Sequence, residues 1–294
     1  MKIVSIINYK GGVGKTTLTT NLAAGLARYG YRVLAIDLDP QTNLTFSFVT
    51  VEEWEKKYET NKTIKHWFNA IIDNEKNIPS FRDLVIKSQG VDVLSSHLGL
   101  IDVDIELAAG LASGTERQRK SNFLKTYSYI RDELVSLGEE YDIALIDCPP
   151  NFSVVTRNAL IASDYYIVPA KMDYLSTLGI NQLRNHVITH VETYNRFIEG
   201  TERDKINPEF LGVIANMVSI KNGAPISAQQ TWIENLKRNE IAIFNTVIRE
   251  NNTIYSNSPE FDLPVLQKPT GTTYTIVVTE LRGLTKELIE KVRL

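Results

Sequence analysis

The sequence predicts an α/β protein with a doubly wound, mostly parallel sheet, and three observations support this prediction. Short, almost continuously apolar segments recur along the chain, which is typical of parallel strands buried on both faces. Segments with apolar residues at helical spacing alternate with them. A glycine-rich loop joins the first apolar segment to the first helical one. Because such β-α-β connections are right-handed crossovers, helices should cover both faces of one sheet.

The elements follow in order along the chain. Predicted strands are the apolar segments at residues 2–8, 32–37, 91–94, 143–147, 165–169, 211–216 and 241–247. Predicted helices cover residues 16–28, 122–137, 178–198, 226–236 and 278–294. Residues 51–89 depart from this alternation, since they are rich in charged and aromatic residues, and we expect a helical insertion there at the rim of the sheet. No repeat or Pro/Gly/Ser linker divides the sequence, so residues 1–294 are expected to form a single domain.

Composition limits the classes of function. The chain has 43% hydrophobic and 23% charged residues, as ordinary globular proteins do, and its net charge of -3 neither requires nor excludes nucleic acid. A single cysteine, Cys148, cannot form an internal disulfide or a multi-cysteine metal site, which suits a reducing cytoplasm. No segment approaches the roughly 18 consecutive apolar residues of a membrane span, and the apolar start is too short for a signal peptide. We therefore expect a cytoplasmic protein.

The glycine-rich loop has the residues of a phosphate-binding site. The segment Lys10-Gly11-Gly12-Val13-Gly14-Lys15-Thr16-Thr17 follows a predicted strand and opens a predicted helix. Glycines let backbone N–H groups converge on phosphate oxygens, and the helix N-terminus adds its positive end. We expect Lys15 to reach the β- and γ-phosphates of a nucleotide and the Thr16 hydroxyl to bind Mg²⁺.

Three ordered motifs carry a family resemblance. An ordinary Walker loop has glycine at position 9, where this chain has Tyr9 followed by a second lysine, Lys10. This loop resembles the deviant Walker A signature of the ParA/MinD superfamily of P-loop ATPases. The resemblance extends to the segments Asp37-Leu38-Asp39-Pro40-Gln41 and Ile143-Ala144-Leu145-Ile146-Asp147. It implies a P-loop NTPase fold of the deviant Walker A type, ATP and Mg²⁺ as cofactors, and an ATP-bound homodimer in which Lys10 reaches the partner's nucleotide.

The resemblance also assigns roles to individual residues. Asp147 matches the Walker B carboxylate that acts on magnesium, mostly through bound water. Asp39 matches the switch carboxylate that helps position the attacking water, and it is a further candidate near the metal. Asp37 is a candidate for holding the loop or the outer shell of the metal. Asn216 matches the adenine-contacting position, although an asparagine at a strand end can equally be a turn residue. Lys10, Lys15 and Asp39 are thus the catalytic candidates, and both matched acids end strands, at the edge where open α/β sheets bind ligands.

The branch of the superfamily follows from what the chain has and lacks. Iron–sulfur reductases and cluster carriers need several thiolates, which one cysteine cannot supply. The segment 278–294 is a basic amphipathic helix, which suits a membrane surface or a helix docked on the sheet, and we favour docking. We expect a dimerising ATPase switch that positions or segregates a plasmid, chromosome or protein assembly on nucleoid DNA, released by a ParB-like partner. The alternatives are a membrane-cycling, MinD-like positioning ATPase and a metabolic P-loop enzyme.

Nonspecific DNA binding would use basic residues of the C-terminal half, through contacts to phosphates. The candidates are Lys221, Arg249 and Lys268, and more weakly Lys237 and Arg238. Surface lysines most often form only a solvated face. Relatives typically carry a further basic residue soon after the position of Arg249, where this chain has three polar uncharged residues. The expectation of DNA binding therefore depends on the resemblance more than on these residues.

Overall fold

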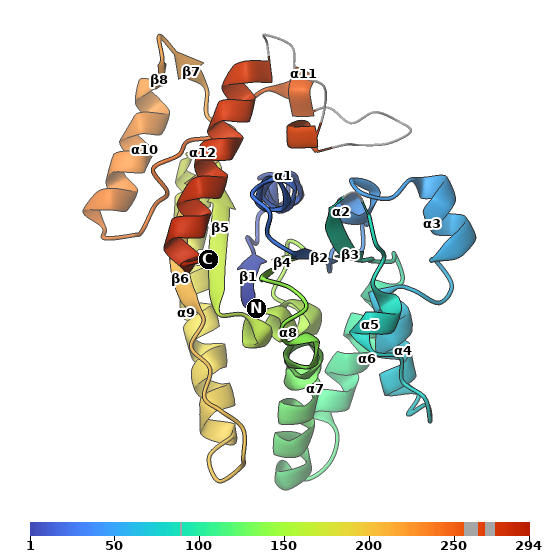
Figure 1. Ribbon diagram of the computed structural model, residues 1–294. Helices are drawn as coiled ribbons and strands as arrows, with labels where there is room; N and C mark the ends of the chain where they lie inside the picture. Colours follow the sequence, from blue (N-terminus) through green and yellow to red (C-terminus); the bar gives the residue numbers. More distant parts are fainter. Residues whose placement is uncertain (89, 256–263, 268–273) are drawn as a thin grey trace.

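The structure is a computed structural model that describes residues 1–88, 90–255, 264–267 and 274–294. Its centre is a six-stranded sheet of order β3-β2-β4-β1-β5-β6 in which all neighbouring strands are parallel (Figure 1). The strands are β1 (Lys2–Ile6), β2 (Val33–Asp37), β3 (Val91–Leu94), β4 (Ile143–Asp147), β5 (Tyr165–Ala170) and β6 (Glu209–Ala215). The predicted doubly wound α/β fold is confirmed.

The remaining elements connect and cover these strands. They are α1 (Lys15–Arg28), α2 (Asn43–Phe46), α3 (Val51–Lys57), α4 (Ile64–Ile72), α5 (Phe81–Leu84), α6 (Leu100–Ala112), α7 (Glu116–Leu137), α8 (Val154–Ala162), α9 (Tyr174–Phe197), the hairpin of β7 (Ile220–Lys221) and β8 (Ala224–Pro225), α10 (Ser227–Arg238), α11 (Asn252–Tyr255), the 3-10 turn η1 (Val265–Gln267) and α12 (Tyr274–Val292).

Two hydrophobic cores lie on the two faces of the sheet, because successive side chains of a strand point to opposite faces. In β2, Val33 and Ala35 join the core under α1 and α12, whereas Leu34 and Ile36 join the core under α7, α8 and α9. Figure 1 shows α1 and α12 on one side of the strands and α7 and α8 on the other. This layering leaves the loops at the carboxyl ends of β1, β2 and β4 together at one edge.

The C-terminal helix α12 docks on the sheet, as the sequence analysis favoured. Its apolar residues Leu281, Leu284 and Leu288 are buried and belong to the same core as the apolar side of α1. Gly25 of α1 allows a close approach, because a Cβ there would lie 2.4 Å from the Thr285 hydroxyl. The apolar stripe of α12 is therefore covered by the fold itself. Within the described ranges, no helix combines the length and the hydropathy needed to cross a membrane.

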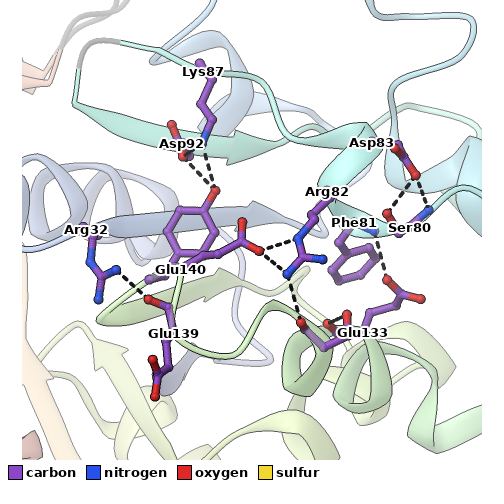
Figure 2. Close-up of polar contacts among 12 residues, drawn as sticks. Arg32, Ser80, Phe81, Arg82, Asp83, Lys87, Asp92, Glu133, Glu139 and Glu140 are labelled. Carbon is purple, nitrogen blue, oxygen red and sulfur yellow. Dashed lines mark hydrogen bonds and ion pairs between the residues drawn. The ribbon is translucent and has the colours of Figure 1, made fainter.

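The segment 51–89 contains α3, α4 and α5, beside the edge strand β3 (Figure 1). Figure 2 shows how polar contacts fix its second half: Arg82 pairs with Glu140, and the backbone N–H of Phe81 donates to Glu133 at 2.9 Å. Lys87 pairs with Asp92 of β3 in the same region. These contacts join the segment to β3 and to the end of α7.

The prediction of a strand at 241–247 is wrong. Only a single bridge, between Val213 and Ile243, links these residues to β6. Beyond it, the backbone N–H groups of Asn245 and Thr246 donate to the Glu287 carboxylate of α12, at 2.7 and 3.0 Å. A side chain from a distant helix thus takes the hydrogen bonds that a strand ladder would use, and the apolar pattern alone cannot reveal this.

Candidate functional site

The phosphate loop between β1 and α1 has a backbone that requires glycine. Gly12 and Gly14 have φ of +68° and +82°, in the left-handed region that other L-residues rarely adopt. Gly14 also leaves room for Asn216, since a Cβ on Gly14 would lie 2.3 Å from the Asn216 side-chain nitrogen. That nitrogen donates to the Val13 carbonyl at 2.8 Å. Asn216 therefore stabilises the loop from the end of β6, and its predicted contact with adenine stays a prediction.

Two residues just before the motif hold the loop against the neighbouring strand and helix. Asn8 is buried, donates to the Pro169 carbonyl at 2.7 Å and accepts from the Lys10 backbone N–H at 2.9 Å. The Tyr9 hydroxyl lies 2.5 Å from Nδ1 of His186 on α9. Asn8 was not predicted as a site residue, because the carbonyl to which it donates, that of Pro169 on β5, comes from a distant part of the chain.

Lys15, Thr16 and Asp147 come together at the start of α1. The Thr16 hydroxyl donates to the Asp147 carboxylate at 2.6 Å, because β1 and β4 pair with Ile6 opposite Asp147. Burial raises the pKa of Asp147 to about 7, although the Thr16 hydrogen bond and the Lys15 charge oppose this shift. Lys15 is also buried, which lowers its pKa, and its ammonium lies 3.4 Å from the Lys10 carbonyl.

This donor set fits a magnesium nucleotide. A hydroxyl and a carboxylate are the hard oxygen ligands that Mg²⁺ prefers, and here they lie within 2.6 Å of each other. Among the residues that the structure describes, Lys15 forms no ion pair within 4.0 Å, so its buried charge suits a phosphate. Loop N–H groups and the N-terminus of α1 would meet the same anion.

The two acids of the second motif have different surroundings. Asp37 is fully buried and accepts hydrogen bonds from the backbone N–H and hydroxyl of Thr45 and from the backbone N–H of Asp39. Burial and the neighbouring Asp147 raise the pKa of Asp37 well above its usual range. Asp39 is half-buried, and its backbone carbonyl accepts from the Ser96 hydroxyl at 2.7 Å. Asp37 thus shapes the loop, whereas the more accessible Asp39 carboxylate accepts from the Gln41 backbone N–H at 3.0 Å.

Lys10 lies in quite different surroundings from Lys15. Its ammonium pairs with Asp173 at 3.0 Å and donates to the Ser176 hydroxyl at 3.1 Å. Asp173 is the N-cap of α9 and accepts from the Ser176 backbone N–H at 2.8 Å. Neither Asp173 nor Ser176 was predicted, because nothing local relates the start of α9 to a loop near residue 10.

The DNA-binding candidates that the structure describes lie on several different elements. Lys221 is exposed on β7, and Lys237 and Arg238 are exposed at the end of α10. Arg249 is paired with Glu280 of α12 at 2.7 Å, so its charge is largely compensated. Lys268 lies outside the described residues.

Comparison with known proteins agrees with this geometry. The AAA domain family matches residues 1–199. The chain is 29% identical over 268 residues to the sporulation initiation inhibitor protein Soj of Bacillus subtilis. The aligned region covers 90% of this chain and 90% of Soj.

Solved structures share the fold over almost the whole chain. Apo McdA of Cyanothece has a TM-score of 0.72 and 20% identity, covering 98% of this chain and 99% of that one. A putative plasmid partition protein of Borrelia burgdorferi, bound to AMPPNP, has a TM-score of 0.66 and 22% identity, covering 99% and 98%. At these identities the structures establish the fold, and the resemblance inferred from the three motifs is confirmed. The chain belongs to the AAA domain family and is a P-loop ATPase of the ParA/MinD type.

Proposed function

We propose that this protein binds Mg²⁺ and ATP, forms a homodimer in the ATP-bound state, and uses slow hydrolysis to time its release from DNA. Its task is to position or segregate a plasmid, chromosome or protein assembly, under the control of a ParB-like activator. One observation carries the proposal. Two lysines of one loop lie in different surroundings: Lys15 is 6% exposed beside Asp147, whereas the Lys10 side chain is 38% exposed in a pair with Asp173.

The buried lysine and its neighbours account for nucleotide chemistry. Lys15 would compensate the charge of the β- and γ-phosphates, and Thr16 and Asp147 would hold the metal. Bound Mg²⁺ supplies electrostatic stabilisation of the charge that develops on the phosphoryl group. Asp39, accessible at the end of β2, would orient the attacking water, while Asp37 keeps the loop in place.

The exposed lysine accounts for dimerisation. A lysine is a flexible point charge that can reach a neighbouring subunit's phosphates. Its pair with Asp173 is partly solvated, and such pairs contribute only about 0–1 kcal/mol, so a phosphate can displace Asp173 without a large cost. The contact in one chain would therefore give way to a contact across the dimer when ATP and a partner are both present.

Size-exclusion chromatography with light scattering, in a non-hydrolysable ATP analogue, tests the dimer. Wild-type protein should elute as a dimer, and Lys10→Ala should bind the analogue yet stay a monomer. Lys76→Ala, which removes an exposed lysine from the loop after α4, is the matched control. Dimerisation of the Lys10→Ala protein to the same extent as the control would contradict the proposed role of Lys10.

Lys221 is the strongest candidate for a DNA contact, since this lysine is exposed on the β7–β8 hairpin. Phosphate contacts predict an affinity for the ATP form that falls steeply with salt and hardly depends on sequence. Lys221→Glu should weaken co-sedimentation with DNA and leave ATP binding intact, whereas Lys76→Glu should leave both unchanged. Arg249→Glu would also break the pair with Glu280, so its stability has to be measured alongside.

Anionic liposomes in a parallel sedimentation arm test the membrane alternative. That alternative would use the apolar stripe of α12, but this stripe is packed in the core with α1. If the protein sediments with liposomes and never with DNA, a membrane surface and not DNA is what its ATP-bound form binds. Vigorous ATP turnover without any macromolecule would instead favour a metabolic enzyme.

A further inference from the structure

The surface is hollowed between the start of α7 and the end of α9. These two helices contact each other and lie in the lower part of Figure 1. The hollow has a volume of about 640 Å³, and its apolar lining consists of Leu111, Phe123 and Phe197. The rings of Phe123 and Phe197 meet edge to face, with centroids 5.0 Å apart. Partly exposed aromatic rings in a concave site are typical of places where an apolar side chain is received.

Basic side chains surround this α7–α9 hollow. Arg117, Arg119 and Lys120 line it, together with one acid, Glu116. Arg196 joins them from α9: its guanidinium and the Lys120 ammonium lie 5.7 and 5.8 Å from the centroid of the same Phe197 ring. In the described part of the chain, none of these four basic residues forms an ion pair with an acid. Several uncompensated positive charges around one apolar floor are complementary to an acidic ligand with an apolar anchor.

The floor of the hollow is continuous with the nucleotide loop through packed rings. Phe123 contacts His190 at 5.6 Å, His190 contacts Phe152 at 6.2 Å, and Phe152 contacts Tyr9 at 5.9 Å between centroids. Burial lowers the pKa of His190 to about 3, so this ring is neutral and packs like its aromatic neighbours. A ligand in the hollow would therefore lie at one end of a row of rings whose other end is the residue before Lys10.

We propose that the α7–α9 hollow docks an acidic segment of a partner protein. An aromatic or aliphatic side chain of that segment lies on Phe123 and Phe197, and its carboxylates face Arg119, Lys120 and Arg196. Duplex DNA fits this place less well, because its phosphates need a broad basic face and not a hollow with an apolar floor. The DNA candidates on β7 and α10 also lie in another part of the molecule (Figure 1). The assignment of the ligand to a partner of an ATPase switch rests on the proposed function.

Fluorescence anisotropy with the full-length protein tests the site. The probe is a labelled synthetic peptide of repeated Glu-Glu-Phe units. Two comparison peptides carry Lys in place of Glu or Ser in place of Phe, and a third comparison probe is labelled oligothymidylate. Wild-type protein should bind the Glu-Glu-Phe peptide better than either comparison peptide. The double variant Lys120→Glu/Arg196→Glu should bind it at least about tenfold more weakly, and Lys76→Glu should bind like wild type.

Three results would overturn the docking site. They are wild-type affinity for the Glu-Glu-Phe peptide that does not exceed the affinity for the two comparison peptides, wild-type peptide affinity in the double variant, or oligothymidylate binding that the double variant loses together with peptide binding. ATP-analogue binding and DNA co-sedimentation are measured on the same preparations. If wild-type protein binds the ATP analogue and DNA but not the peptide, only the docking site is refuted. If it does not bind the ATP analogue or DNA, the proposed function itself is contradicted.

Discussion

Replacement of Gly14 by alanine should destabilise the protein through two effects that the structure separates. Gly14 has φ of +82°, and a left-handed conformation costs a non-glycine residue about 1–2 kcal/mol. The new Cβ would also meet the Asn216 side-chain nitrogen at 2.3 Å, which is too close, so Asn216 must move. Its hydrogen bond to the Val13 carbonyl is then lost, and a buried unpaired group costs about 1–3 kcal/mol. The free energy of unfolding should fall by about 2–5 kcal/mol.

A double-mutant cycle tests this explanation. Asn216→Ala alone removes the same hydrogen bond and should cost about 1–3 kcal/mol. In the Gly14→Ala background the bond is already lost, so Asn216→Ala should add almost nothing. Urea unfolding, followed by circular dichroism, gives the four free energies. Additivity of the two single changes within about 0.5 kcal/mol would refute the reasoning, because it would mean that the two residues do not interact.

Other predictions concern the chemistry of the site. Lys15→Ala should abolish ATP binding measured by calorimetry, since a buried phosphate charge would be left uncompensated, and unchanged affinity would contradict its assignment. Asp39→Ala should keep ATP binding but stop phosphate release, and normal turnover would remove Asp39 from the mechanism. Because the pKa of Asp147 is about 7 without metal, protons compete with Mg²⁺ below that value. The Mg²⁺ concentration needed for binding an ATP analogue should rise several-fold between about pH 8 and about pH 6, and a midpoint independent of pH would show that Asp147 does not bind the metal.

The sequence by itself predicted the sheet and the nucleotide loop, because both are encoded in contiguous residues. The run Val33-Leu34-Ala35-Ile36 is continuously apolar, which predicts a strand buried on both faces without any knowledge of tertiary contacts. The loop motif is equally local, since φ above zero at two positions demands glycine whatever surrounds them.

Only the tertiary structure decided how distant side chains act on these local elements. Asp173 lies 163 positions from Lys10, and Asn216 lies 203 positions from Val13, so no pattern in the sequence relates them. For the same reason the sequence analysis assigned a strand to residues 241–247, where Glu287 takes the backbone hydrogen bonds. The α7–α9 hollow arises only when two helices, separated by the whole of β4, α8 and β5, dock side by side. Such contacts depend on how the elements are placed relative to one another. This placement is determined by the burial of both faces of the sheet and not by local sequence.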